Sequence, residues 1–275
     1  MNKIFKFADD TKLEGKVSSP QERQTLQDDL NTLVEWSEKW QMKFNVDKCQ
    51  VLHVGRNNSK AIYEIKGKDL EVVVEVKDLG VIVSDDMKVS KQCHKAAKKG
   101  NQVLGLIART FSCKSSKIVN LLYKSLVRPH LDYCIQVRRP HLVKDIDILE
   151  KVQRRATRMA IECKGHSYEQ RLAMMKLTTL ETRRLRADLL EVFKIMRGME
   201  GVREEVFFTR SAESRRGHEL KLYKRRAKLD VGKYRFGNRV VNDWNSLPTS
   251  VVEADTINSF KGKLDTYLRN IRGMR

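Results

Sequence analysis

The chain has 275 residues, of which 55 are Lys or Arg and 35 are Asp or Glu, so its formal net charge is +20. This imbalance favours a polyanionic partner, most often nucleic acid and less often an anionic membrane surface. The hydrophobic content of 40% is too high for a fully disordered chain, and no run approaches the roughly 18 apolar residues of a membrane-spanning helix. The five cysteines are widely spaced, which excludes a disulfide scaffold and close-spaced zinc motifs and favours an intracellular protein.

The excess positive charge lies mainly in the second half of the sequence. Residues 1–112 carry 19 Lys and Arg against 16 Asp and Glu, whereas residues 113–275 carry 36 against 19. The densest stretch, 207–240, has 11 basic and 3 acidic residues with aromatic residues between them. Such a stretch suits nucleic acid, because basic groups neutralise phosphates and aromatic rings stack on bases. A solvated basic surface over a small aromatic core is the alternative, and the pattern leaves both open.

The first elements predict a mixed α and β region. We expect a β-hairpin over residues 3–16 and a helix over residues 20–41, which Ser19 caps and Glu22 completes as a capping box. Short strands are expected at residues 50–54, 61–66, 70–76 and 79–83. The alternation of Leu70, Val72, Val74 and Val76 with polar residues predicts a half-buried sheet.

Beyond about residue 88 the strand patterns stop and helical spacing takes over. Helices are expected over residues 88–111, around 118–126 and 146–159, from 180 to a stop at Gly198, and over 256–271. The fold class is therefore α+β, with strands and one helix at the front and helices behind. Domain boundaries are expected near residues 88 and 200.

Asp9 and Asp10 form the sharpest local feature. A tight hairpin normally prefers Asn-Gly or Asp-Gly at its tip, whereas two adjacent carboxylates repel each other. A divalent cation would remove that repulsion, and Mg²⁺ commonly binds one or two carboxylates together with substrate phosphates. The alternative is a solvated acidic turn, which the spacing alone favours.

Six segments, in order along the chain, resemble reverse transcriptases of non-long-terminal-repeat retrotransposons, the LINE-type elements of the jockey and chicken-repeat group. The segments are Phe7-Ala8-Asp9-Asp10-Thr11, Phe44-Asn45-Val46-Asp47-Lys48-Cys49, Lys77-Asp78-Leu79-Gly80-Val81, Leu126-Val127-Arg128-Pro129-His130, Val152-Gln153-Arg154-Arg155-Ala156-Thr157-Arg158 and Trp244-Asn245-Ser246-Leu247-Pro248. The resemblance extends from residue 3 to about residue 270. It implies an RNA-directed DNA polymerase with an RNA template and a DNA primer as partners.

The resemblance also assigns roles to domains and residues. It implies a partial palm over residues 1–88, a helical thumb or connection over 89–200 and a basic, mainly helical C-terminal region over 201–275. The catalytic residues would be Asp9 and Asp10, as ligands of Mg²⁺ or Mn²⁺, and Lys48, as a general acid for the leaving pyrophosphate. The primer grip would be Leu79, Gly80 and Val81. The candidate nucleic-acid-binding residues are Arg154, Arg155, Arg158, Arg215, Arg216, Lys224, Arg225 and Arg226.

The family's palm uses three carboxylates, and one of them precedes the Asp-Asp hairpin by many residues. Because the sequence begins eight residues before Asp9, we expect a truncated polymerase that is inactive alone and would need a complementing reverse-transcriptase fragment. Two alternatives stay open. One is a non-catalytic RNA- or DNA-binding module built from the basic thumb and tail. The other is a non-functional reading frame with a partly unfolded product.

A few further residues carry weaker expectations. Trp36 and Trp40 are expected in the core, and Trp244 is expected to anchor packing. Arg138-Arg139 stands where the resembling proteins tend to carry aromatic or apolar residues, so the local packing should differ there. Residues 224–228 form a weak nuclear-import pattern, which leaves nucleus and cytoplasm both open.

Overall fold

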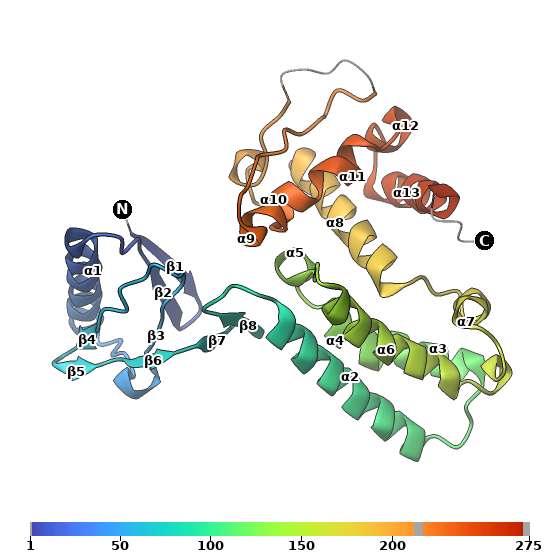
Figure 1. The fold of residues 1–275 in the computed structure, drawn as a ribbon, viewed down its shortest axis with the longest axis horizontal. Coiled ribbons are helices and arrows are strands. Elements are labelled where there is room, and N and C mark those ends of the chain that lie inside the picture. Colours follow the sequence, from blue (N-terminus) through green and yellow to red (C-terminus); the bar gives the residue numbers. More distant parts are fainter. Residues whose placement is uncertain (1, 212–216, 272–275) are drawn as a thin grey trace. The chain divides into compact units, whose positions relative to one another are not determined.

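The structure is a computed structural model that describes residues 2–211 and 217–271 (Figure 1). The chain divides into two compact units, residues 1–88 and residues 89–275. Unit 1 combines short strands with one long helix, and unit 2 is built from helices, so the fold is mixed α and β of the α+β kind.

Unit 1 begins with an antiparallel hairpin, β1 (Lys3–Phe7) and β2 (Asp10–Glu14), followed by helix α1 (Pro20–Lys39). The predicted capping box is present. The Glu22 backbone N–H donates to Ser19 Oγ at 3.1 Å, and the Ser19 backbone N–H donates to Glu22 Oε2 at 3.1 Å. Two of the donors that a helix start leaves unpaired are thereby satisfied, which explains why the helix begins where the sequence predicts it.

The remaining strands of unit 1 form small two-stranded sheets. A 3₁₀ turn, η1 (Val46–Lys48), leads into β3 (Gln50–Leu52), β4 (Glu64–Ile65), β5 (Lys68–Asp69), β6 (Glu71–Val73), β7 (Glu75–Asp78) and β8 (Val81–Ser84). The pairs are β1–β2, β4–β5 and β7–β8, all antiparallel, and β3–β6, which is parallel.

The predicted half-buried sheet over residues 70–76 is wrong. The chain bends at Val74, so residues on either side of it join different sheets. Val72 and Val74 are 52% and 62% exposed, and of the alternating set only Leu70 lies in the core of the unit. Alternation placed these side chains on one face, but a two-stranded ribbon does not supply a second layer to cover that face.

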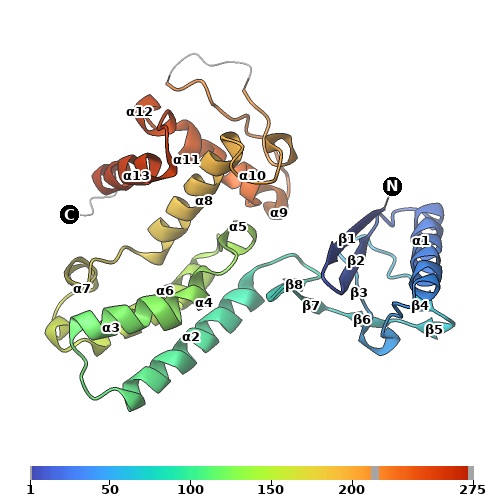
Figure 2. The same ribbon diagram turned by 180° about the vertical axis from the view of Figure 1, so that it is seen from behind.

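Unit 2 starts with a bundle of helices. Its elements are α2 (Ser90–Thr110), α3 (Ser116–Leu122), the π-helical turn η2 (Tyr123–Val127), α4 (Arg128–Asp132), α5 (Ile135–Arg138), α6 (Val143–Met159), the 3₁₀ turn η3 (Ile161–Cys163), α7 (Tyr168–Met174) and α8 (Leu180–Met196). Buried apolar side chains of α2, α3, α4 and α6 form one core cluster. Figure 2 shows α2 and α6 lying side by side.

The C-terminal part of unit 2 packs on α8. It contains η4 (Glu204–Val206), α9 (Asp230–Lys233), α10 (Phe236–Arg239), α11 (Val241–Asn245), α12 (Thr249–Val252) and α13 (Ile257–Ile271). Trp244 is fully buried, its Nε1–H donates to the Leu220 carbonyl at 2.7 Å, and it packs near Phe260. The expected role of Trp244 as a packing anchor is confirmed.

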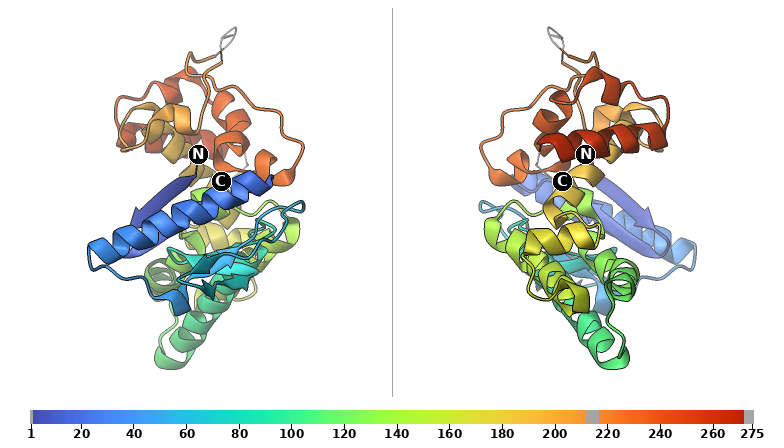
Figure 3. Two further views of the ribbon diagram at one scale, coloured as in Figure 1. Left: turned by 90° about the vertical axis from the view of Figure 1, so that its left-hand side faces the viewer. Right: turned by 90° about the vertical axis from the view of Figure 1, so that its right-hand side faces the viewer.

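The two tryptophans at the C-terminal end of α1 are more exposed than Trp244. Trp36 and Trp40 are 37% and 62% exposed, so their expected burial in the core is wrong. Trp36 instead faces the first hairpin, where Lys6 Nζ lies 3.9 Å from the centre of its ring, and Figure 3 shows α1 beside this hairpin. Within the described residues, no helix is both long and apolar enough to cross a membrane.

Candidate functional site

The acidic hairpin places both aspartates at its tip. β1 and β2 pair in register from Lys3 with Glu14 to Phe7 with Asp10, which leaves Ala8 and Asp9 as the two-residue turn. Ala8 has a φ of 53°, in the left-handed region that favours glycine. Asp9 therefore lies in the turn and Asp10 begins β2, and both are exposed.

The chemistry of this pair suits a hard divalent cation. Neither carboxylate forms an ion pair or a side-chain hydrogen bond within the described part of the chain. Two neighbouring carboxylates are also a donor set that Mg²⁺ accepts when substrate phosphates complete its coordination. Among the described residues, however, no group of three His, Cys, Asp or Glu side chains gathers at one point. The carboxylates of Asp9 and Asp10 are thus suitable ligands for such a metal ion, and together they would supply two of its ligands.

An ion pair brings the hairpin close to the candidate primer grip. Lys12 Nζ, on β2, lies 3.3 Å from Asp78 Oδ2, at the end of β7. Leu79 and Gly80 form the turn that follows, with φ of 43° and 84°, the left-handed pair typical of a two-residue hairpin turn. The turn is exposed at Leu79, whereas the Val81 side chain is buried. The backbone of the turn and the Leu79 side chain can therefore meet a ligand, but the Val81 side chain serves the core.

Lys48 is not joined to the aspartates. It is exposed at the end of η1, and within the described residues neither a hydrogen bond nor an ion pair connects it to Asp9 or Asp10. Its neighbour Asp47 instead forms an ion pair with Lys68. The role of Lys48 as a general acid stays a prediction.

A cationic surface of unit 2 lies on α2 and α6. Helix α2 contains five Lys and Arg residues and no Asp or Glu. Three of its lysines and three basic residues of α6 repeat with the same spacing of four and then three residues, which aligns each set along one side of its helix. We call them together the α2–α6 basic face: Lys91, Lys95, Lys98, Lys151, Arg155 and Arg158, all exposed.

Two contacts, at the start of α2 and near its middle, hold the two helices parallel. Ser90 Oγ donates to Asp145 Oδ2 at 2.6 Å, and Arg155 Nη1 donates to Asn101 Oδ1 at 2.9 Å, so both helices run in the same direction. Between these contacts, a Cβ atom added at Gly100 would lie 3.0 Å from a methyl group of Val152. A glycine at this crossing lets the two helices approach closely.

Of the three acidic residues of α6, Asp147 is exposed one helical turn before Lys151, whereas the other two lie in the interior. Asp145 and Glu150 are buried, and Glu150 accepts hydrogen bonds from Tyr168 Oη and from the Leu180 backbone N–H at 2.9 Å. Burial, together with the Glu150 carboxylate, raises the pKa of Tyr168 far above its ordinary value, so this phenol stays neutral. Arg154, a predicted binding residue, is exposed and lies 5.0 Å from the centre of the Tyr168 ring.

The basic stretch 207–240 divides into core and surface. Phe208 and Phe236 are buried and pack against each other with ring centres 5.7 Å apart, which matches the expectation of a small aromatic core. Lys224, Arg225 and Arg226 are exposed, and Arg225 Nη2 donates to Thr209 Oγ1 at 2.9 Å. The predicted residues Arg215 and Arg216 lie outside the described residues.

Of the α2–α6 basic face, the sequence predicted only Arg155 and Arg158 as binding residues, so Lys151 and the three lysines of α2 were missed. The signal was available, because a 21-residue helix with five basic residues and no acidic residue is readable from the sequence alone.

The chain matches no known family model, no curated protein and no solved structure.

Proposed function

We propose that this chain is the palm-to-C-terminal part of a reverse transcriptase of the non-LTR retrotransposon type, and that the activity it carries by itself is nucleic-acid binding. The observation that carries the proposal is the α2–α6 basic face. Its six cations lie in two rows on neighbouring helices that run in the same direction, against one exposed carboxylate on these helices, that of Asp147. Such rows favour a regular polyanion over a small anion.

The dimensions of the face favour a duplex. The rise of a helix is about 1.5 Å per residue, so each row extends over about 10 Å. Phosphates on one strand of a duplex repeat about every 3.4 Å along its axis, so one row corresponds to about three steps. Two parallel rows of cations can contact the two phosphate backbones of a duplex, or one backbone and the groove beside it. We therefore propose an RNA–DNA hybrid, the duplex of template and primer, as the ligand.

Unit 1 supports the assignment to a polymerase through the contact between its two hairpins. The Lys12–Asp78 pair joins the Asp9-Asp10 hairpin to the Leu79-Gly80 turn, and a polymerase needs its metal ligands beside the primer end. Asp9 and Asp10 would hold Mg²⁺ or Mn²⁺ together with nucleotide phosphates, and the ion would supply positive charge that stabilises phosphoryl transfer. The exposed Leu79-Gly80 turn would support the primer strand.

The binding proposal is tested by neutralising part of the face. Lys95, Lys98 and Lys151 are replaced together by Gln, and equilibrium binding to an RNA–DNA hybrid is measured with the full chain near physiological salt. Each lost phosphate contact also loses the counterion release that favours binding, so we expect affinity to fall by roughly tenfold or more.

A matched control removes the same charge elsewhere. Lys261, Lys263 and Arg269 lie on α13, and their joint replacement by Gln also lowers the net charge by three. We expect this control to bind within about threefold of the wild type, since only distant electrostatic attraction is lost. Equal losses in both variants would mean that net charge, and not the α2–α6 basic face, governs binding.

The proposed catalytic role of Asp9 has a separate test, which does not depend on the measurement of binding affinity. Primer extension on an RNA template is measured with Mg²⁺ or Mn²⁺, for the wild type and for Asp9→Asn. Any extension that depends on the hairpin should be lost in Asp9→Asn while binding to the hybrid is retained. Extension that survives this substitution would contradict a catalytic role for Asp9.

A further inference from the structure

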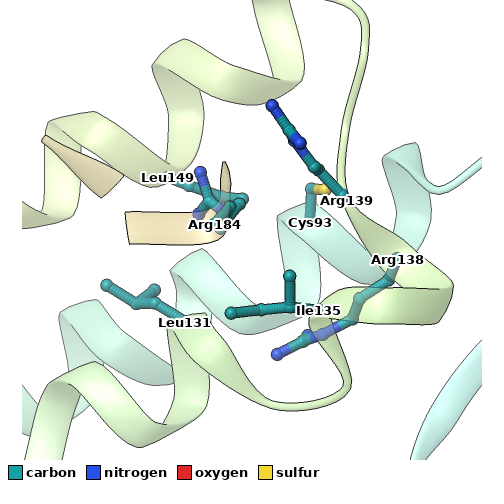
Figure 4. Close-up of a pocket in the computed structure, with 7 residues that line it drawn as sticks. All are labelled: Cys93, Leu131, Ile135, Arg138, Arg139, Leu149 and Arg184. Carbon is teal, nitrogen blue, oxygen red and sulfur yellow. The ribbon is translucent and has the colours of Figure 1, made fainter. Parts of the chain in front are cut away.

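Unit 2 contains a small, partly open cavity lined by three arginines, Arg138, Arg139 and Arg184, by the Cys93 thiol and by aliphatic side chains (Figure 4). The arginines come from two places in the chain, the end of α5 and the first half of α8. The cavity offers about 10 Å³ to the centre of a water-sized sphere, which is room for one small ligand.

Arg184 is the unusual member of this lining. Its side chain belongs to a residue that is 2% exposed, and both Nη1 and Nη2 are buried without a hydrogen-bond partner in the part of the chain that the structure describes. A buried guanidinium with unpaired donors is strongly unfavourable, because the charge has lost its water and gained no compensating acceptor.

Of the neighbouring carboxylates, Asp188 is engaged through both oxygens, whereas Asp132 and Asp145 each keep one buried oxygen, Oδ1, that accepts no hydrogen bond within the described residues. Asp188 Oδ2 accepts from Arg139 Nη1 and from Arg239 Nε, each at 2.9 Å. Asp132 is paired with Arg183, and Asp145 Oδ2 accepts from Ser90 Oγ.

None of these three carboxylates is among the residues that line the cavity. Arg138 donates to the carbonyls of Tyr133 and His130. The lining itself is thus cationic and rich in donors, and none of its residues is a carboxylate.

We infer that this cavity binds a single monatomic anion, chloride being the available one, against the Nη1 and Nη2 donors of Arg184. A whole phosphate or carboxylate group is larger than this space, which admits about one water-sized sphere. Cys93 does not supply the charge, since burial raises the pKa of its thiol to about 11 and keeps it protonated.

The position of the site gives it a structural role. Its lining residues belong to α2, α4, α5, α6 and α8, so the anion would join the first helical cluster of unit 2 to the helix on which the C-terminal cluster packs. Binding to the folded state alone stabilises it in proportion to the logarithm of anion concentration.

The test is the stability of the full chain in sodium chloride exchanged for sodium methanesulfonate at constant ionic strength. Methanesulfonate screens surface charge equally but cannot enter the cavity. Above the dissociation constant, each tenfold rise in chloride should lower the unfolded-to-folded ratio tenfold, equivalent to about 1.4 kcal/mol. A stability that is the same in both salts would overturn the inference.

Variants of Arg184, a control variant and a crystallographic measurement complete the test. Arg184→Met should abolish the chloride response, whereas Arg158→Met, which removes an exposed cation of α6, should retain it. If Arg184→Met does not fold, Arg184→Lys should shift the response to higher chloride. Crystals grown in bromide should show an anomalous peak beside Arg184, and an ordinary water at that position would overturn the inference.

Discussion

At the scale of single residues, one buried carboxylate organises the middle of unit 2. Asp188 is fully buried and accepts from Arg139 and from Arg239, which also donates to the carbonyls of Ile135 and Gln136. These contacts join α5, α8 and α10. They also pair the charge of Arg139 inside the protein, which explains how an arginine is accommodated at this position.

Asp188→Asn should therefore be strongly destabilising. The substitution keeps the shape but removes the negative charge between two arginines, and breaking a buried pair in this way typically costs about 3–5 kcal/mol. Urea unfolding measures the loss. Asp265→Asn is the control, because Asp265 pairs with Arg186 at a partly exposed site and should cost about 1 kcal/mol or less. Similar losses in the two variants would contradict the role given to Asp188.

Asp86 should make unit 1 sensitive to acid. Hydrogen bonds from the Lys88 backbone N–H and from Ser84 Oγ lower the pKa of Asp86 from 3.8 to about 2. Because the folded state has the lower pKa, its stabilisation is complete above pH 3.8 and is lost as the pH falls towards about 2. Between these values, the free energy of unfolding should fall more steeply in the wild type than in Asp86→Asn. Parallel curves would contradict this assignment.

At the scale of elements, helices followed from the sequence better than strands. The capping box of α1 and the glycine that follows α8 are local signals, and local hydrogen bonds decide where those helices begin and end. The alternation of residues 70–76 was correctly seen, but which strand each segment joins depends on distant partners. A bend at Val74 redirects the chain, and no local pattern encodes that bend.

The two glycines of α2 should respond differently to alanine. Near Gly105, an added Cβ would meet only a flexible arginine terminus at 3.8 Å, so Gly105→Ala should stabilise the protein by about 0.5–1 kcal/mol through helix propensity. At Gly100 the same gain is offset, because the Cβ would lie 3.0 Å from Val152 and 3.4 Å from Leu131. Thermal or urea unfolding compares the two, and equal stabilisation would contradict the close contact of α2 with α6.

At the scale of the whole molecule, charge is divided between the two units. Residues 1–88 contain 14 Lys and Arg against 16 Asp and Glu, whereas residues 89–275 contain 41 against 19. A division of the charge at residue 112 places the lysines of α2 in the weakly charged half, away from the basic residues of α6. The acidic hairpin was found because its residues are adjacent, whereas the α2–α6 basic face unites residues more than fifty positions apart.

The central claim, that unit 2 binds nucleic acid through the α2–α6 basic face, is tested most directly by the salt dependence of binding. Affinity for an RNA–DNA hybrid is measured with the full chain over a range of salt concentrations, for the wild type, for the Lys95, Lys98 and Lys151 triple variant and for the α13 control. The wild type should give a log–log slope of several units, and the triple variant should reduce it by roughly 0.9 per lost phosphate contact, as on duplex DNA. The control should keep the wild-type slope. A slope near zero in the wild type, or an unchanged slope in the triple variant, would contradict the account.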